Sequence, residues 1–396
     1  MEEENVQVVI RIRPMQANEK KNGDVPCVKA ISDGREVQVK VGPLEAQNYR
    51  CQRCFNPDTS QAIFFNECGI TDFLDSAIEG YRACAFAFGQ TGAGKTYTMF
   101  GALKGINHRD KNIGMIARSI DYIFTKLNHS TLQYRLRLSC LEIYQEHVFD
   151  LIADEKDRAP LSIREHANDG FFLEGCRLVD CKDFEIACAV LDAAMKNRQV
   201  GEHDLNGRSS RSHCLTEVHI ETFPNNNTDT VIRGKMTLVD LAGSERLKST
   251  NSTGKVRQEA GFINKSLYVL GKVIAGLVRT NGDLNHKDVP YRDSKLTKLL
   301  ITSLGGNGRT LLISCVSEAK GSQAETLRTL KFSMSCARIR NKPVKFLDPQ
   351  QKLILELKEE IKRLKMENRK LRTTLLTAPA SGERGSGASV GGGDGD

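Results

Sequence analysis

Residues 89–96 read Gly-Gln-Thr-Gly-Ala-Gly-Lys-Thr, a complete G-x-x-x-x-G-K-T phosphate-loop pattern. The apolar run Ala-Cys-Ala-Phe-Ala-Phe at residues 83–88 stands directly before it and predicts a buried strand. A strand, a glycine-rich turn and a helix in this order let backbone N–H groups and the positive end of the helix face phosphate oxygens. In this setting Lys95 reaches the β- and γ-phosphates, and Thr96 offers its hydroxyl to Mg²⁺. The sequence therefore predicts a site for a nucleoside triphosphate.

The composition of the 396-residue chain predicts a cytosolic protein with a large core. No apolar run approaches the roughly 18 residues that a membrane span requires, so we expect no membrane insertion. The start Met-Glu-Glu-Glu lacks the positive charge of a secretory signal. The 12 cysteines are scattered singly through apolar segments, which indicates reduced thiols in the core.

The net charge of +8 is concentrated in one part of the chain. Between Arg246 and Arg309 there are twelve lysine and arginine residues against four aspartate and glutamate residues, so this basic block carries the whole excess. Such a block is typical of a protein that binds a large acidic partner, either nucleic acid or an acidic protein surface. A merely solvated face is the alternative, although solvated faces normally mix both signs.

Hydrophobic patterning predicts strands that alternate with helices. We expect strands at residues 6–12, 83–88, 136–144, 214–223, 235–241 and 310–316. Helical periodicity follows the phosphate loop and appears again at residues 184–199, 262–278 and 294–303. Interleaving of this kind indicates a three-layer α/β/α fold, in which helices cover both faces of a central, mostly parallel sheet.

The pattern changes beyond Pro343. Steps of three and four residues, the a and d spacing of a coiled coil, separate Ile354, Leu357, Ile361, Leu364, Asn368, Leu371 and Leu375. This seam predicts a homodimer through residues 354–375, and the alternative is an amphipathic helix that folds back on the domain. Residues 381–396 are rich in Gly and Ser, which predicts disorder.

Two further segments are suited to sensing a γ-phosphate. Residues 235–240 (Lys-Met-Thr-Leu-Val-Asp) predict an apolar strand that ends in an acid, and such a carboxylate holds Mg²⁺ directly or through water. Leu-Ala-Gly-Ser-Glu follows at residues 241–245 and gives Gly243 a backbone N–H that is free to approach the γ-phosphate. Upstream, residues 206–213 (Asn-Gly-Arg-Ser-Ser-Arg-Ser-His) form a polar segment rich in hydroxyl groups.

Together these segments resemble the kinesin motor domain. Residues 206–213 are similar to its switch I and residues 240–245 to its switch II, in the family's order behind the phosphate loop. Further blocks typical of the family stand at residues 11–14, 141–144, 263–267, 289–297, 305–307, 325–327 and 329–332. The resemblance runs from about Val6 to Pro343. It implies a P-loop NTPase fold, with a motor domain at residues 1–341, a neck linker at 342–350, a coiled coil at 351–377 and a disordered tail at 378–396.

The resemblance implies a site for ATP and Mg²⁺. Its nucleotide-binding residues would be Arg11, Arg13, Pro14, Gly89, Gln90, Thr91, Gly92, Ala93, Gly94, Lys95, Thr96, Tyr97, Asn206 and Ser209. Thr96 and Ser210 would ligate Mg²⁺, with Asp240 behind a coordinated water. The catalytic residues would be Ser210, Arg211, Gly243 and Glu245.

Among these catalytic residues, a salt bridge between Arg211 and Glu245 would close switch I against switch II, and Glu245 with waters would relay the proton. A purely structural ion pair between the same two side chains is the alternative.

The resemblance also implies a microtubule-stimulated ATPase motor that is associated with microtubules in the cytoplasm and cytoskeleton. A motor domain placed before the heptads favours movement toward the plus end. The residues expected to contact tubulin are Arg246, Lys255, Lys265, Arg292, Lys295 and Lys298. The alternative is a nucleotide-regulated microtubule crosslinker with weak or no directed motility. A nucleic-acid partner is disfavoured, because the basic block lacks the interleaved aromatic residues of strand binders.

The predicted linker departs from the family pattern at Phe346, where many kinesins carry an asparagine that latches the docked linker. Residues 1–5 are also short and acidic for the strand that covers the linker in the family. We therefore expect weak docking, which favours the crosslinker alternative.

Overall fold

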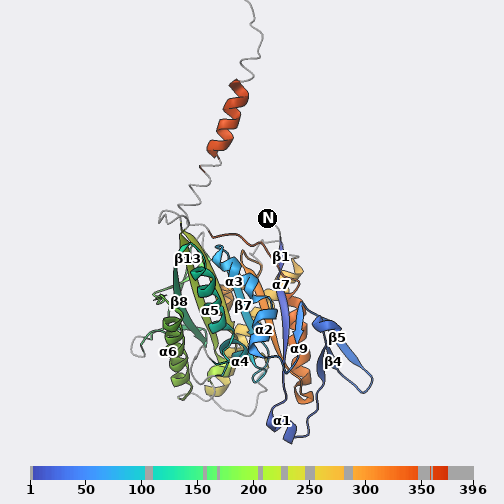
Figure 1. The fold of residues 1–396 in the computed structure, drawn as a ribbon. Coiled ribbons are helices and arrows are strands. Elements are labelled where there is room, and N and C mark those ends of the chain that lie inside the picture. Colours follow the sequence, from blue (N-terminus) through green and yellow to red (C-terminus); the bar gives the residue numbers. More distant parts are fainter. Residues whose placement is uncertain are drawn as a thin grey trace, which may run out of the picture. The chain divides into compact units, whose positions relative to one another are not determined.

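The computed structural model describes residues 3–102, 110–154, 158–166, 170–203, 208–223, 231–245, 255–280, 289–346, 357 and 360–372. The chain divides into one compact unit, Met1–Phe346, and a second unit, Leu347–Asp396. In the second unit residues 360–372 form a helix (Figure 1). Three residues of its predicted seam, Ile361, Leu364 and Leu371, are 50%, 49% and 58% exposed. Their pairing in a coiled coil stays a prediction.

A nine-stranded sheet forms the centre of the first unit. Eight strands lie side by side in the order β12 (Val179–Cys181), β8 (Gln133–Tyr144), β13 (His213–Phe223), β14 (Ile232–Asp240), β7 (Arg82–Phe88), β15 (Arg309–Ser317), β2 (Gln7–Arg13) and β6 (Arg53–Phe55). The ninth, β9 (His147–Asp150), pairs with β8. Neighbours from β14 to β6 are parallel, and the remaining pairs are antiparallel. The phosphate loop therefore follows a strand in the parallel part.

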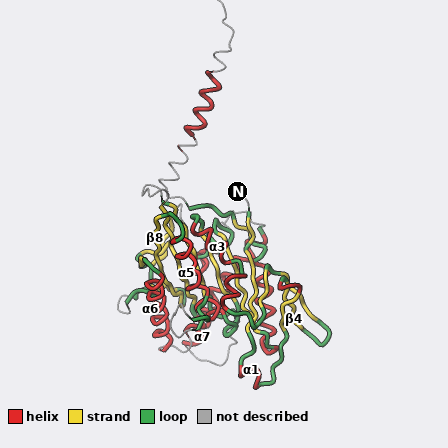
Figure 2. Tube along the Cα trace, viewed as in Figure 1, coloured by secondary structure: helices red, strands yellow, loops and turns green. Residues whose placement is uncertain are grey.

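Helices cover both faces of this sheet (Figure 2). One face packs against α2 (Gln61–Glu67), α3 (Ile70–Ile78), α4 (Lys95–Phe100), α5 (Met115–Asn128) and α6 (Phe184–His203). The other face packs against α7 (Lys255–Arg279), α8 (Lys295–Leu299) and α9 (Gln323–Cys336). Because both faces are covered, six of the seven residues of β7 are buried, which explains its continuous apolar sequence. The three-layer α/β/α fold predicted from the sequence is confirmed.

The predicted strands correspond to β2, β7, β8, β13, β14 and β15, whereas one predicted helix is shorter than expected. The pattern at residues 294–303 predicts a helix, but α8 ends at Leu299. Beyond it the chain continues as turns, in which Leu300 and Leu304 still reach the core. The apolar spacing is therefore preserved without a continuous helix.

Several short elements have no predicted counterpart. A separate antiparallel sheet consists of β3 (Val28–Ile31), β4 (Glu36–Lys40) and β5 (Ala46–Arg50), and its β4–β5 hairpin projects to the right in Figure 1. The strands β10 (Ser162–His166) and β11 (Gly170–Glu174) form a second separate sheet, which is antiparallel. The helix α1 (Ala17–Lys21) lies in the loop between β2 and β3. In strands of three to five residues, the alternation of polar and apolar side chains is mostly too short to be recognised as a periodic pattern.

The first five residues of the predicted linker lie along the first unit. Before them, β1 (Glu4–Asn5) pairs with β16 (Arg340–Asn341) at the end of the predicted motor domain, and the expectation that residues 1–5 are too short to cover the linker stays a prediction. The buried Asn341 amide donates to Ser303 O at 2.9 Å and Gly308 O at 2.7 Å. The linker N–H groups then donate to the core, from Lys342 to Gly306 O, from Val344 to Asn307 O and from Phe346 to Gly80 O. Residues 342–346 are therefore docked in this structure.

Candidate nucleotide-binding site

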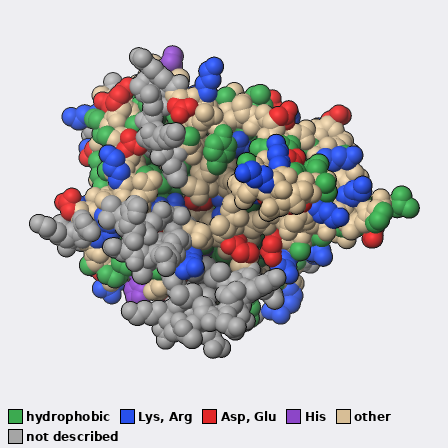
Figure 3. All heavy atoms as spheres, turned by 90° about the horizontal axis from the view of Figure 1, so that it is seen from below, with side chains coloured by type: hydrophobic (Ala, Val, Ile, Leu, Met, Phe, Trp, Pro, Cys, Tyr) green, Lys and Arg blue, Asp and Glu red, His purple; other side chains and the backbone are tan. Residues whose placement is uncertain are grey.

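The phosphate loop bridges β7 and α4 at the end toward which the parallel strands run. Gly89 begins it with a φ of 149°, and a Cβ there would lie 2.1 Å from Cys315 O, so no other residue fits. Lys95 is 7% exposed, and its Nζ donates to Gln90 O at 2.9 Å. Burial lowers the pKa of the Lys95 ammonium, and the carboxylate of Asp240 opposes that shift. Figure 3 views this end of the molecule, where acidic and basic side chains both reach the surface.

The structure brings together two residues predicted to hold Mg²⁺. In the parallel register Asp240 of β14 stands beside Ala87 of β7, so its carboxylate lies next to the phosphate loop. Thr96 Oγ1 donates to Asp240 Oδ2 at 2.8 Å. Asp240 is 1% exposed, and its Oδ1 has no hydrogen-bond partner within the described ranges. A hydroxyl and a spare buried carboxylate oxygen are hard oxygen ligands, so these residues fit Mg²⁺ or a water bound to it.

The switch segments contact each other and the phosphate loop through their backbones. The N–H of Gly243 donates to Ser210 O at 3.0 Å, and the N–H of Ser244 donates to Gly89 O at 3.1 Å. The Gly243 N–H is the group predicted to approach the γ-phosphate. In this structure the Gly243 N–H must break its hydrogen bond to Ser210 O before it can donate to a phosphate oxygen.

Glu245 contacts the phosphate loop directly. Its carboxylate accepts from the backbone N–H of Thr91 at 2.7 Å and from the hydroxyl of the same residue. Its predicted salt bridge with Arg211 stays a prediction. Asn206 lies outside the described residues, and the side chain of Ser209 is also outside them.

Arg11 and Arg13, the two arginines before Pro14, both form hydrogen bonds with other residues of the protein. Arg11 is 7% exposed and donates to Gln61 Oε1 at 2.7 Å and to Thr98 Oγ1 at 3.1 Å, so it braces α2 against α4. Its guanidinium lies 5.4 Å from the ring centre of Tyr97, which is 43% exposed and open to a flat ligand. Arg13 donates to Gly92 O at 2.6 Å and thereby holds the phosphate loop from β2.

Arg198 is a site residue that the sequence analysis missed. It lies on α6, is 2% exposed, and its guanidinium stands 3.2 Å from Asp240 Oδ2. The same carboxylate oxygen therefore receives both Thr96 and Arg198. Nothing in the sequence marks it, because Arg198 stands among the polar residues Lys196, Asn197 and Gln199 and belongs to no motif.

His213 is a second missed residue, although it ends the switch I segment. Its Nδ1 accepts from the N–H of Ala242 at 2.9 Å, so the proton is on Nε2, which lies 2.8 Å from Ser266 Oγ of α7. Burial lowers the pKa of the imidazole to about 3, and the charges of Arg198 and Lys95 act in the same direction. This neutral histidine thus joins switch II to α7.

The predicted tubulin contacts lie on elements that pack together. Lys265 is an exposed residue of α7, and Lys272 of that helix stands 3.7 Å from Asp293 of the 3-10 turn η6 (Tyr291–Asp293). Arg292 of η6 pairs with Glu165 at 2.7 Å. The half-buried Lys295 and Lys298 belong to α8. Arg246 lies outside the described residues, and only the backbone of Lys255 is described.

Within the described ranges, no helix combines the length and the apolar character that a membrane crossing requires. All 12 cysteines are free thiols, and ten of them are buried, in agreement with reduced thiols in the core.

A phosphate loop after a buried parallel strand, with an acid at the end of the neighbouring strand, defines a P-loop NTPase. A family model described as "Kinesin motor domain" matches residues 11–339. The chain belongs to the kinesin family and carries its ATP-hydrolysing motor domain.

Individual relatives agree with this assignment. The chain is 37% identical to the mouse chromosome-associated kinesin KIF4 over 365 residues, which are 91% of this chain and 29% of that protein. It is 36% identical to the mouse kinesin-like protein KIF12 over 389 residues, 95% of this chain and 59% of that protein. A solved structure titled as that of a fast kinesin has a TM-score of 0.79 and 35% identity, and covers 87% of this chain and 95% of that one. The chain thus spans under two thirds of these two curated relatives.

Replacing Arg198 tests the buried ion pair. Arg198→Ala leaves the buried carboxylate of Asp240 without the guanidinium that pairs with it directly, so we expect the free energy of unfolding to fall by about 3–5 kcal/mol. Urea unfolding followed by circular dichroism measures this loss. Arg164→Ala is the matched control, because it breaks the exposed pair with Glu174 and should cost less than about 1 kcal/mol. Equal losses in the two variants would contradict the assignment.

The pKa of His213 predicts a specific acid sensitivity. The unfolded chain binds a proton at this residue below about pH 6.5, whereas the folded chain does so only near pH 3. This histidine therefore lowers stability as the pH falls through that window, by up to about 1.4 kcal/mol per pH unit. His213→Asn should flatten the fall in unfolding free energy between pH 6.5 and 4, measured by urea unfolding. The exposed His147→Asn should leave it unchanged, and an unaltered slope in His213→Asn refutes the prediction.

Proposed function

We propose that this chain is a microtubule-stimulated ATPase motor that uses ATP binding and hydrolysis for movement along microtubules toward the plus end. The observation that carries the proposal is the direct bonding of both switch segments around the phosphate loop. Glu245 bonds Thr91, Ser244 bonds Gly89, and Gly243 bonds Ser210. A γ-phosphate that enters this arrangement must displace these contacts, so nucleotide state is coupled to switch conformation.

The residues of the site divide the chemistry between positioning and electrostatics. Lys95 neutralises the β- and γ-phosphates after it exchanges its bond with Gln90 O. Thr96 and Ser210 would hold Mg²⁺, with Asp240 behind a water, and the ion would supply further positive charge at the phosphate oxygens. After switch closure Arg211 pairs with Glu245, which then positions the attacking water and relays its proton.

Basic side chains on α7, η6 and α8 form the track-binding surface in this proposal. Lys265 and Arg292 are exposed, and Lys295 and Lys298 are half-buried at the same group of elements. Their surplus of positive charge suits the acidic surface of a microtubule and predicts binding that weakens with salt. His213 and Ser266 connect this surface with switch II, because Ser266 belongs to α7.

The linker is the output, and in this chain an aromatic contact replaces the missing asparagine. The Phe346 ring lies 4.6 Å from the guanidinium of Arg82, while its N–H donates to Gly80 O at 2.7 Å. Lys345 adds a contact to Glu79 at 3.5 Å and lies 5.4 Å from the ring centre of Tyr81. A cation over an aromatic face contributes about 0.5–2 kcal/mol, enough to favour the docked linker several-fold. This latch supports a docked linker in the proposal, and the expectation of weak docking stays a prediction.

The remaining parts of the proposal are a homodimer through residues 354–375 and an association with microtubules in the cytoplasm. The crosslinker alternative keeps the same site and the same track-binding surface. It differs in one respect, because its linker would not produce directed movement.

The motor function is tested by ATP turnover and by gliding. We expect microtubules to raise ATP turnover strongly, and Lys95→Ala to abolish it, because the variant loses the positive charge that Lys95 brings to the β- and γ-phosphates. Surface-held chain should move polarity-marked microtubules with their minus ends leading. If microtubules do not raise ATP turnover, the proposal is refuted. If they raise ATP turnover but do not glide, the crosslinker alternative is supported instead.

The latch predicts a separation of movement from turnover. Phe346→Ala removes the ring that Arg82 covers, so we expect gliding to slow several-fold while turnover without microtubules stays unchanged. Phe346→Asn, which restores the side chain of many kinesins, should glide at close to the wild-type speed. Gliding of Phe346→Ala at full speed would show that the contact does not hold the linker.

A further inference from the structure

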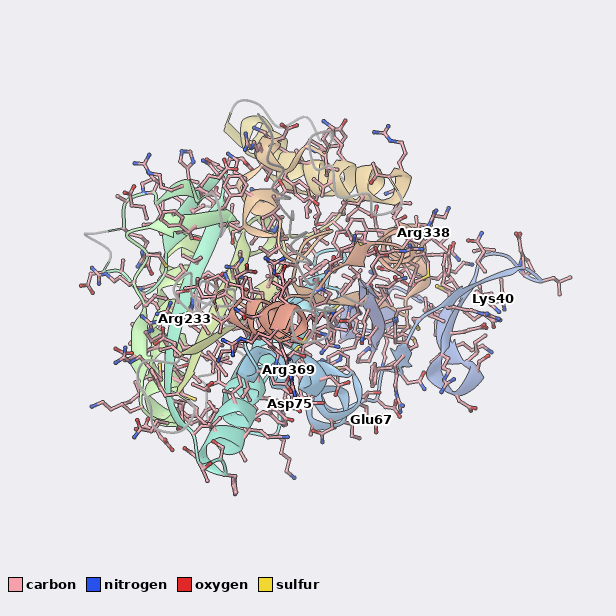
Figure 4. All side chains as sticks on the ribbon, turned by 90° about the horizontal axis from the view of Figure 1, so that it is seen from above. Lys40, Glu67, Asp75, Arg233, Arg338 and Arg369 are labelled. Carbon is pink, nitrogen blue, oxygen red and sulfur yellow. The ribbon has the colours of Figure 1, made fainter. Side chains whose placement is uncertain are left out.

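The outer side of α7 carries an exposed aromatic ring among positive charges. Exposed residues recur on this helix at steps of three and four, and they are Lys265, Tyr268, Lys272, Ala275 and Arg279. This spacing puts them on one stripe along the helix. Three of these five residues are cations and none is an acid. Figure 4 shows α7 in pale yellow at the outer edge of the molecule, at the top of the view.

Tyr268 is the most exposed tyrosine or phenylalanine among the described residues. It is 67% exposed, against 46% for Phe172 and 43% for Tyr97. With two thirds of its surface in water, the ring contributes little to the core, so the fold does not require an aromatic residue at this position. Tyr291, whose side chain is also described and belongs to the same basic block, is buried. Among the described side chains, the block therefore offers no series of rings for stacking a nucleic-acid strand.

The contacts of Tyr268 connect it with the track-binding surface of the proposed function. The ring centre lies 5.6 Å from Lys272 Nζ, and this ammonium stands 3.7 Å from Asp293 Oδ2 of η6. Arg292, which precedes Asp293, and Lys265, which precedes Tyr268 by one turn, are both expected to contact tubulin. Tyr268 therefore stands among the proposed track contacts, although no sequence pattern singles it out.

We propose that Tyr268 is an uncharged anchor of the contact with the microtubule, and that its ring supplies the part of the affinity that salt does not screen. This inference rests on the function proposed above. Attraction between exposed charges weakens with ionic strength, whereas the burial of an aromatic ring does not depend on that attraction. Tyrosine is enriched among the residues that dominate protein interfaces, because its ring offers a large contact area and its hydroxyl a polar tip.

The stripe also defines the chemistry of the surface that it meets. Lys265 and Lys272 lie one turn on either side of the ring, so they suit carboxylates that border an apolar patch. The ring covers the patch itself, and its hydroxyl donates to one of the carboxylates. Charge complementarity then orients the two proteins, and the ring prolongs the contact once it is formed.

A merely structural role for Tyr268 would act through Lys272. A ring beside an ammonium holds that side chain in place by a cation–π contact. Removal of the ring would then impair the charge of Lys272 alone, and the affinity lost would be the part that salt screens. The two roles therefore differ in how binding responds to salt.

Co-sedimentation of the full chain with microtubules, over a series of KCl concentrations, tests the anchor. Tyr268→Ala should raise the dissociation constant at least about tenfold at every concentration and leave its dependence on salt unchanged. Tyr268→Phe keeps the ring and should retain most of the affinity. Lys265→Ala should instead reduce the dependence on salt, because it removes one charge from the interface. A wild-type chain that does not bind microtubules would refute both the proposed function and the anchor.

Two further comparisons isolate the ring. Leu44→Ala removes the exposed apolar side chain between β4 and β5 and should bind as the wild type does, while urea unfolding of Tyr268→Ala should keep the wild-type midpoint. In a chain that already carries Lys272→Ala, Tyr268→Ala should still weaken binding about tenfold. The anchor is overturned, and the track-binding surface is not, if the wild type binds and Tyr268→Ala binds equally well. It is also overturned if Tyr268→Ala has no effect beside Lys272→Ala.

Discussion

The buried carboxylate of Asp240 is the interaction on which the rest of the site depends. Parallel pairing of β14 with β7 delivers it to the phosphate loop, and one oxygen then receives Thr96 from α4 and Arg198 from α6. A buried charge of this kind is tolerated only while its partners stay in place, because its desolvation costs several kcal/mol. Three elements from distant parts of the chain are thereby fixed around a single atom. Among the described residues the second oxygen, Oδ1, has no hydrogen-bond partner, which suits the Mg²⁺ role proposed for it.

In the proposed function, two contacts next to Asp240 determine how a change at the phosphates reaches α7. The Gly243 N–H bonds either Ser210 O, as here, or a phosphate oxygen, and one N–H cannot do both well. The preceding residue, Ala242, donates to His213, whose other nitrogen meets Ser266 of α7. A shift of switch II is therefore felt by α7 through a short chain of buried hydrogen bonds. Such an exchange between alternative bonds produces discrete states rather than a graded deformation.

The sequence predicts the layers of this fold and the core of its site because both rest on local patterns. The loop at residues 89–96, the strand before it and Asp240 at the end of another strand are each visible in a few consecutive residues. Arg198 and His213 are not, because their roles arise only when α6, β13 and α7 meet around switch II. The contact between Arg82 and Phe346 is not predictable from the sequence for the same reason, because the two residues stand far apart in the chain. Local patterns predict which residues are buried and which belong to the phosphate loop, whereas tertiary partners depend on how the elements meet.

Residues 342–346, the linker of the proposed function, are held at two places in this structure. Gly80 follows α3, whose end packs directly on the sheet: a Cβ on Gly234 of β14 would lie 1.7 Å from Ala77 O, so the two backbones are in contact. Gly306 and Asn307, which hold Lys342 and Val344, instead follow α8 and the turns after it. Since α8 packs on α7, these anchors adjoin the elements proposed to meet the track and to receive the signal from switch II. In the proposed function, linker docking therefore depends on the position of the α7 and α8 layer relative to the sheet.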